Sequence, residues 1–328
     1  MDRIEEMLAR YKSWCEKLGI VTAGDINRII DEGKTDTLIN LSEIWHEQNI
    51  SEIAEKIRDN IREKRIVMIS GPSSSGKTSF AKKLQLHLRV LGINAVSISM
   101  DDYYIESEKM PKNPDGTPDY EALQSIDYMR FNRDMELLTI GETAVMPRMD
   151  FETGVINQTA TTLKLEKDEI IIVEGIHGLN DKIISNIDSE RKYKIYCSAL
   201  TALSTDDGKR IKSRTTRFIR RLIRDYKFRN SSCKNTFMLW PGVEEGARKN
   251  IFPYTDTADV IFNSSLLYEL AVYKSFLNEV FDKSECDEKD SGEIAALRDL
   301  LGNFHEIPAR STPHSSIIRE FIGGSTIL

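Results

Sequence analysis

Residues 71–78, GPSSSGKT, constrain the fold of this chain more than any other segment. They match the pattern Gly-x-x-x-x-Gly-Lys-Thr at every position, between the apolar run Ile66–Ser70 and a stretch with helical periodicity at 80–90. A glycine-rich loop between a strand and a helix turns its backbone N–H groups around a polyphosphate, and the helix N-terminus favours the same anion. A chance match in a Gly/Ser-rich linker is the alternative, but the flanking elements argue against it. The sequence therefore predicts a loop that binds a nucleoside triphosphate.

Two side chains of the loop have expected roles. Lys77 would reach the β- and γ-phosphates, and Thr78 supplies a hydroxyl of the kind that binds Mg²⁺. The expected nucleotide-binding residues are Gly71, Ser73, Ser74, Ser75, Gly76, Lys77, Thr78 and Ser79.

Composition narrows the class of protein. A net charge of -7 over 328 residues argues against broad binding to nucleic acids or to membrane surfaces, although a local basic patch is still possible. No apolar stretch reaches transmembrane length, and the charged N-terminus is unlike a signal peptide, so we expect a cytoplasmic protein.

Free thiols are expected, because the four cysteines lie far apart without metal-ligand spacing: Cys15, Cys197, Cys233 and Cys286.

The chain divides into three parts. Residues 1–62 are expected to be helical, and they either dock on the following domain or end an upstream one. Residues 63–283 alternate strands and helices, with strands expected at Ile66–Ser70, 95–99, 170–173, 194–197 and Val260–Asn263. This alternation predicts an α/β fold of the P-loop type, a doubly wound parallel sheet with helices on both faces. Residues 284–328 read as a charged linker, a helix and a tail that docks on its own core or on another subunit.

Two acidic residues follow predicted strands. Asp101 could accept a proton from an acceptor hydroxyl or bind the metal, because α/β sites gather at the carboxyl ends of strands; a helix cap or turn is its structural alternative. Glu174 ends the run IIIVE and is a candidate Mg²⁺ ligand, or a cap of the next turn. Tyr103 and Tyr104 could stack on a base or close the core, and His177 is given no catalytic role.

A basic run stands out against the acidic background. Its members at 217, 220, 221 and 224 recur at helical spacing and share one side of a helix, so an anion would relieve their mutual repulsion. Such runs are usually solvated or RNA-binding faces, but an arginine-rich lid over phosphates fits the loop better, since it would exclude water. The run contains Lys209, Arg210, Lys212, Arg214, Arg217, Arg220, Arg221, Arg224, Lys227 and Arg229.

With these pieces in order, residues 64–281 resemble the uridine kinase and phosphoribulokinase family of P-loop kinases. The resemblance is strongest to a bacterial branch whose uridine kinase-like domain follows a region similar to part of threonyl-tRNA synthetase, and residues 1–62 then resemble the end of that region. It is carried by PSSSGKTSFAKKL, PRMDFETG, VEGIHGLN, RDYKFRN and IFPYTDTADVIFNSSLLYELAV.

The resemblance implies an ATP- and Mg²⁺-dependent nucleoside kinase, expected to be a homo-oligomer. Asp101 matches the first acid of an Asp-x-Phe-Tyr motif and would be the general base for the nucleoside 5′-hydroxyl. Tyr104 falls where a tyrosine borders the base, and Glu121 falls where an acid binds the ribose hydroxyls. Matches to arginines that embrace substrate and phosphates are Arg221, Arg224 and Arg229.

The expected base pocket departs from the family. Met149 and Gly154 stand where uridine-cytidine kinases carry a tyrosine and a histidine, and Ser231 replaces a lid arginine of the animal enzymes. Losing the histidine removes a discrimination between bases, so a wider or purine-accepting pocket is expected, and Met149 could pack on a larger ring.

Two other functions remain open. The first is a kinase for another small hydroxylated metabolite, such as a sugar phosphate or pantothenate. The second is a nucleotide-binding regulatory or RNA-associated module, suggested by the basic helix and the synthetase-like resemblance.

Overall fold

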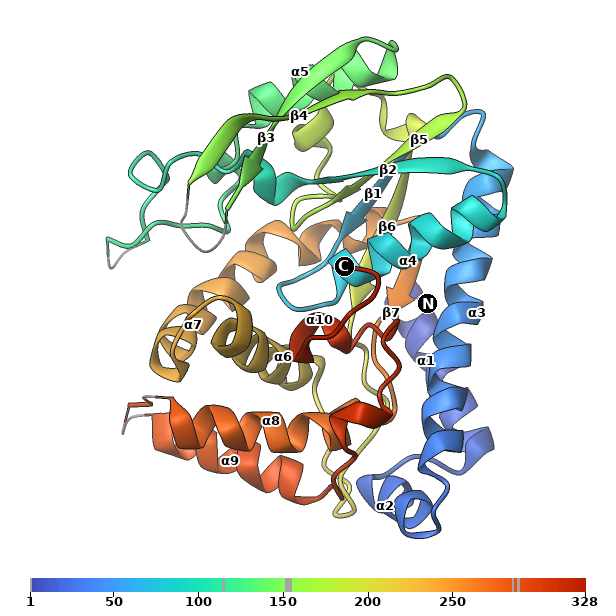
Figure 1. Ribbon diagram of the computed structural model, residues 1–328, viewed down its shortest axis with the longest axis vertical. Coiled ribbons are helices and arrows are strands. Elements are labelled where there is room, and N and C mark those ends of the chain that lie inside the picture. Colours follow the sequence, from blue (N-terminus) through green and yellow to red (C-terminus); the bar gives the residue numbers. More distant parts are fainter. Residues whose placement is uncertain (1, 114–115, 151–154, 285, 288–289) are drawn as a thin grey trace.

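The computed structural model describes residues 2–113, 116–150, 155–284, 286–287 and 290–328, and a five-stranded parallel sheet lies at its centre (Figure 1). The strand order is β2-β5-β1-β6-β7. The five predicted strands are confirmed, with ends that shift by at most two residues. Their bounds are β1 Ile66–Ser70, β2 Asn94–Ser99, β5 Glu169–Glu174, β6 Lys192–Ser198 and β7 Val260–Asn263.

The central strand β1 explains why both faces of the sheet are covered. Val67 and Ile69 belong to the larger hydrophobic cluster, whereas Ile66 and Met68 belong to a second cluster. Successive side chains of a strand point to opposite faces, so a strand with four apolar residues in a row has to be buried on both sides. The sequence pattern of β1 therefore requires packing elements on each face.

Helices supply this packing, and the predicted α/β class is confirmed. Residues from α3, α4, α6 and α8 join the larger cluster, and residues from α5 join the second. Among the described residues, no helix combines the length and the apolar character needed to cross a bilayer. The helix bounds are α1 Arg3–Leu18, α2 Ala23–Asp31, α3 Thr35–Asn60, α4 Lys77–Val90, α5 Tyr128–Thr139, α6 Ser213–Phe228, α7 Cys233–Asn250, α8 Glu269–Lys283, α9 Ser291–Gly302 and α10 Arg319–Ile322.

An antiparallel pair of strands, which the sequence reading did not predict, stands beside the main sheet. Strand β3 (Thr143–Met149) pairs with β4 (Ile156–Lys164). Ala144 and Met146 of β3 are buried in the cluster that contains α5. Most of β4 is exposed, and its sequence INQTATTLK is polar, so it carries little of the apolar pattern by which strands are recognised.

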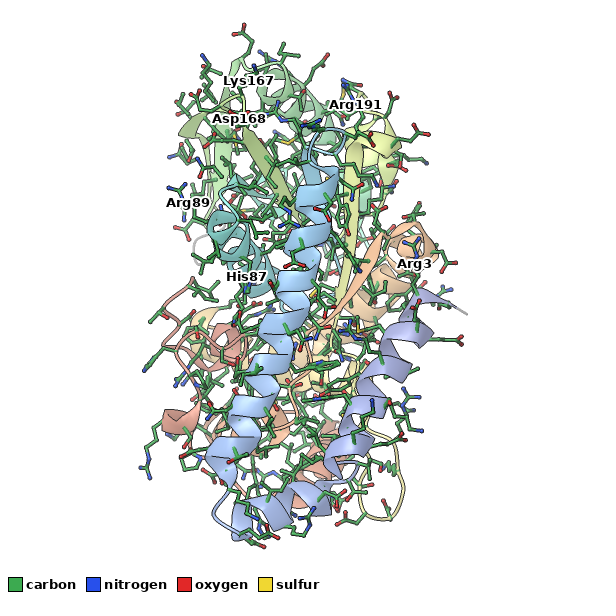
Figure 2. All side chains as sticks on the ribbon, turned by 90° about the vertical axis from the view of Figure 1, so that its right-hand side faces the viewer. Arg3, His87, Arg89, Lys167, Asp168 and Arg191 are labelled. Carbon is green, nitrogen blue, oxygen red and sulfur yellow. A yellow bond between two sulfur atoms is a disulfide. The ribbon has the colours of Figure 1, made fainter. Side chains whose placement is uncertain are left out.

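The N-terminal helices pack directly on the sheet domain. Ile53 and Ile57 of α3 are buried in the same cluster as Leu84 of α4. Figure 2 shows α3 running along this side of the molecule with His87 of α4 beside it. Nε2 of His87 lies 2.7 Å from a carboxylate oxygen of Glu47 in α3. Residues of this N-terminal segment therefore dock on the domain that follows them.

The C-terminal tail also docks on its own chain. Ile317, Ile318 and Phe321 are fully buried in the larger cluster. The short helix α10 lies against α6, near the loop that connects β1 with α4 (Figure 1). The tail therefore reaches the region where the sequence places the nucleotide loop.

The cysteines correct one prediction. Cys233 and Cys286 form a disulfide, whereas Cys15 and Cys197 are free and buried. The paired residues are 53 positions apart in sequence, but the fold brings their Cα atoms to 5.3 Å, within disulfide range. Sequence spacing gives no hint of this approach, so the expectation of four free thiols is wrong for this pair.

Candidate functional site

The loop between β1 and α4 needs its two motif glycines for steric reasons. Gly76 has a φ of +86°, in the left-handed region that favours glycine. A Cβ on Gly71 would lie 2.0 Å from the carbonyl oxygen of Cys197 and 2.8 Å from Oγ of Ser75. Both glycines are therefore required by the shape of the loop before any ligand binds.

Several polar groups of the loop have unused hydrogen-bonding capacity. The hydroxyls of Ser74, Ser75 and Ser79 are buried, and within the described part of the chain they have no hydrogen-bond partner. Such groups are rare in folded proteins and are commonly completed by a ligand or by water. The first N–H groups of a helix also have no acceptor within that helix. The loop therefore fits an anion with several oxygen atoms.

Lys77 is folded back onto the same loop. Its Nζ donates to the carbonyl oxygens of Gly71 at 2.9 Å and Pro72 at 3.3 Å. These bonds hold the ammonium group at the cavity beside the loop, which Lys77 lines. A phosphate bound by the loop would therefore meet a positive charge already in place.

Arginines of α6 hold the loop from the other side. Arg217 donates to the Ser73 carbonyl oxygen at 3.3 Å, and Arg221 donates to the Ser73 hydroxyl at 2.9 Å. Arg220 donates to the carbonyl oxygen of Ser74 at 3.4 Å. The helix expected to form a lid is thus bonded to the loop through three successive contacts.

The prediction that an anionic ligand neutralises the positive charges of this helix is wrong for two of its arginines, Arg217 and Arg220. Arg220 is completely buried and lies 2.8 Å from the carboxylate of Glu269. Arg217 lies 2.7 Å from the carboxylate of Glu244. Carboxylates from α8 and α7 therefore neutralise these two charges, and both arginines support the structure.

The remaining arginines gather around one buried carboxylate, Asp225. It lies 3.1 Å from Nε of Arg221, 2.9 Å from Nη2 of Arg224 and 3.9 Å from Nε of Arg229. The charge of Arg224, followed by burial, lowers the pKa of Arg229 to about 10. Three guanidinium groups crowded in this way favour a further anion nearby.

Glu174 and Thr78 lie close enough to share a cation. Glu174, at the end of β5, accepts a hydrogen bond from the Ser99 hydroxyl at 3.0 Å and lies 3.5 Å from the Thr78 hydroxyl. Ser99 in turn accepts from the backbone N–H of Asp101 at 3.3 Å. Ser99 therefore links the two acidic residues that follow neighbouring strands.

The chemistry of this group fits Mg²⁺. Burial raises the pKa of Glu174, and the nearby Asp101 carboxylate is the next cause, so a cation between the two would relieve an unfavourable buried charge. Hydroxyl and carboxylate oxygens are suitable ligands, and Mg²⁺ is commonly held by one or two carboxylates together with substrate phosphates. Within the described ranges no group of three or more His, Cys, Asp or Glu side chains could hold a metal alone. Phosphate oxygens together with water would complete the site.

Glu121 faces the same region from the far side. Burial raises its pKa to about 7, and its Oε2 has no hydrogen-bond partner among the described residues. Gly246 of α7 leaves room for this side chain, because a Cβ there would lie 2.2 Å from the Cβ of Glu121. Asn250 fixes the backbone by donating to the Glu121 carbonyl oxygen at 2.7 Å. The Oε2 atom of this carboxyl group is thus positioned for a hydroxyl donor that none of the described residues provides.

Tyr104 and Met149 line the space next to Glu121. The Tyr104 hydroxyl donates to the Tyr120 carbonyl oxygen at 3.0 Å, and the two rings meet edge to face. Met149 ends β3, where its N–H donates to Asp102 at 3.0 Å. Gly154, the other expected difference in the base pocket, lies outside the described residues.

One cavity of about 460 Å³ connects the phosphate loop with the space beside Glu121, Tyr104 and Met149. This volume is in the range of small-molecule sites. The structure thus brings together predicted residues from segments far apart in sequence. From the predicted set, the lining contains Ser73, Ser74, Ser75, Gly76, Lys77, Thr78, Asp101, Tyr104, Glu121, Met149, Glu174, Arg221, Arg224 and Arg229.

Other residues of the site were missed by the sequence reading. Asp225 could have been found from its spacing of four residues from Arg221 and Arg229. Nothing in the sequence points to Gly246 or Glu320, which reach the site through tertiary packing. His177 is fully buried, and burial lowers its pKa to about 4, so its ring is neutral near pH 7.

Comparisons with known proteins identify the family to which this chain belongs. Residues 66–267, more than half of the chain, match the sequence model of the phosphoribulokinase / uridine kinase family. A uridine kinase from Clostridium perfringens (strain 13 / Type A) is 29% identical over 168 residues, which cover 51% of this chain and 71% of the relative. A uridine kinase from Ureaplasma urealyticum serovar 10 is 23% identical over 181 residues, covering 55% and 78%.

A solved structure is also similar. The structure of a possible uridine kinase from Bacillus stearothermophilus has a TM-score of 0.44 and 20% sequence identity, and the match covers 66% of this chain and 98% of the other. The residues matched by the family model include the loop, Asp101, Glu121, Glu174 and the arginines of α6.

Proposed function

Since this chain belongs to the phosphoribulokinase/uridine kinase family, we propose that it transfers the γ-phosphoryl group of ATP to the 5′-hydroxyl of a ribonucleoside. The observation that carries this proposal is the cavity in which Lys77 and Asp101 lie together with Glu121. Phosphoryl transfer depends on positioning and on electrostatic stabilisation, so a phosphate loop and a hydroxyl-binding carboxylate in one cavity suit it. We assign the activity to residues 63–283.

On the donor side, the loop N–H groups and Lys77 bind the phosphates of ATP. Arg224 and Arg229 supply positive charge where negative charge develops on the transferring group. Thr78, Glu174 and Asp101 would hold Mg²⁺. When bound, that ion neutralises charge on the phosphate oxygens.

On the acceptor side, Glu121 binds the ribose through its unpaired carboxylate oxygen, which can accept from a hydroxyl. The positive charge of Arg221 opposes the effect of burial on Glu121, whose pKa is nevertheless raised to about 7. Asp101 takes the proton of the 5′-hydroxyl as the bond to phosphorus forms. Tyr104 borders the base and Met149 packs against it, which leaves a pocket that accepts purines as well as pyrimidines.

The test is a product analysis. The purified chain is incubated with ATP, Mg²⁺ and a panel of ribonucleosides, deoxyribonucleosides and pantothenate, and phosphorylated products are identified by mass spectrometry. A ribonucleoside 5′-monophosphate is the expected product. Ribonucleosides should react faster than deoxyribonucleosides, because the latter lack one of the hydroxyls that Glu121 accepts from.

Other outcomes point to different functions. Phosphorylated pantothenate as the product would show that pantothenate, rather than a nucleoside, is the acceptor. ADP release without any phosphorylated acceptor would contradict the kinase proposal and favour a regulatory or RNA-associated module, whose RNA binding should weaken steeply with salt. A strict preference for uridine and cytidine would refute the wider base pocket.

A further inference from the structure

The C-terminal tail places a carboxylate on the nucleotide loop. Glu320 of α10 accepts a hydrogen bond from the backbone N–H of Ser79 at 3.0 Å. Ser79 is the third residue of α4, so its N–H is one of the donors at the helix N-terminus that have no acceptor within the helix. Glu320 also lines the cavity that holds Lys77 and Thr78. An internal anion thus occupies a donor of the kind that binds phosphate.

Tail and loop are in direct contact at a second point. A Cβ placed on Gly76 would lie 3.3 Å from Cδ1 of Ile317, so the tail packs against the loop backbone just before α4. Ile317 and Phe321 are fully buried on either side of Glu320 in sequence. The contact between Glu320 and Ser79 is therefore part of a docked interface.

The backbone of the tail is held independently of Glu320. The buried side chain of Arg319 donates to the carbonyl oxygens of Ala309 at 2.9 Å, Gly323 at 3.2 Å and Pro313 at 3.4 Å. Glu320 itself is only partly buried. Its side chain can therefore rotate off the loop while the tail stays docked, which costs little compared with releasing the whole tail.

We propose that Glu320 is a displaceable internal competitor of the nucleotide. A phosphate oxygen and the carboxylate cannot both take the Ser79 N–H, and two anions at one helix N-terminus repel each other. Nucleotide binding therefore requires the Glu320 side chain to rotate away. Only molecules in which the carboxylate is off the loop can bind the nucleotide. The apparent dissociation constant is therefore the intrinsic one divided by the fraction of such molecules. This inference rests on the proposed function in taking the loop as the nucleotide site.

The experiment compares dissociation constants by isothermal titration calorimetry, with ATP and with inorganic triphosphate as probes, each with and without Mg²⁺. Glu320→Gln removes the charge and should bind both probes about tenfold more tightly than the unmodified chain, a difference that corresponds to about 1.4 kcal/mol. Glu320→Asp keeps the charge but shortens the side chain, and should give an intermediate value. The matched control is Glu306→Gln, which removes an exposed carboxylate from the same tail and should change the dissociation constant by less than twofold.

Several results would overturn the proposal. These are equal affinities for Glu320→Gln and the unmodified chain, weaker binding by Glu320→Gln, an equal gain in Glu306→Gln, or no binding of ATP by any of these proteins. Thermal unfolding of each variant establishes that it is folded.

Acceptor phosphorylation is measured on the same preparations to separate the two proposals. Tighter ATP binding by Glu320→Gln without any phosphorylated acceptor would support the competitor and refute the proposed kinase. Acceptor phosphorylation together with an unchanged affinity of Glu320→Gln for ATP would support the proposed kinase and refute Glu320 as a competitor.

Discussion

Gly246→Ala tests whether the position of Glu121 controls acceptor binding. In the native packing a Cβ at this position would lie 2.2 Å from the Cβ of Glu121 and 2.5 Å from its Cγ. Carbon atoms in ordinary contact are about 3.5–4.0 Å apart, so one side has to move by more than about 1 Å. Cβ of Glu121 moves only with its backbone, which Asn250 and Asp119 hold, so rotation of the side chain cannot relieve the clash. The Glu121 backbone or α7 has to shift, and either shift changes the position of the carboxylate in the site.

The expected effect on the reaction is large. A displacement of about 1 Å in a positioning group can lower the rate about a hundredfold, so we expect kcat/KM for the ribonucleoside to fall by about that factor. The dissociation constant of ATP should stay within about twofold, because the loop is not touched. Overpacking costs about 1–3 kcal/mol of stability, partly offset by the better helix propensity of alanine, which is worth up to about 1 kcal/mol.

The assay is initial-rate kinetics with the acceptor varied at saturating ATP, together with ATP titrations and urea unfolding. Gly292→Ala is the control, since Gly292 lies in α9, is not among the residues that line the cavity, and a Cβ there would meet no atom within 4 Å. Acceptor kinetics that are unchanged in Gly246→Ala, or reduced equally in Gly292→Ala, would refute the role of Glu121 in positioning the acceptor.

Three further variants test the roles assigned to single residues. Asp101→Asn should lower kcat by about 10²–10⁴ because it removes the proton acceptor, with ATP affinity nearly unchanged by titration; turnover close to normal would exclude it as the base. Lys77→Ala should lower kcat by about 10²–10³ through loss of charge at the transferring group, measured in the same rate assay, and unchanged activity would contradict the site as a whole. Burial raises the pKa of Glu121 to about 7, so acceptor binding should weaken as pH falls through 7 and the carboxylate is protonated. This folded-state pKa lies above the usual value of 4.5, so the ionised carboxylate destabilises the folded protein at high pH. In urea unfolding, Glu121→Gln should therefore be more stable than the unmodified chain at pH 8 by up to about 3 kcal/mol, and the difference should vanish below pH 4.5. A stability difference that does not depend on pH would refute this linkage.

The strands and the loop could be predicted because their signals are local. The first four residues of Ile66–Ser70 are apolar, which is typical of a strand buried on both faces, and the loop motif follows this strand directly. Asp101 and Glu174 could be placed near the loop because both follow strands of one parallel sheet, whose carboxyl ends meet at one edge.

What could not be predicted depends on contacts between distant segments. The pairing of Arg220 with Glu269 joins two helices, and the sequence shows only an arginine within a basic run. The polar strand β4 owes its structure to β3 rather than to its own residues. Glu320 lies 241 residues from Ser79 in sequence, so only the docked tail shows that they meet.

The bonds of α6 also decide how a change at one side of the site reaches the other. Arg217, Arg220 and Arg221 bond α6 to Ser73 and Ser74 of the loop. Arg217 also pairs with Glu244 of α7, and Phe218 stacks on Trp240 of the same helix. Because α7 carries Gly246 and Asn250, which position Glu121, the phosphate loop and the acceptor side are mechanically connected through α6.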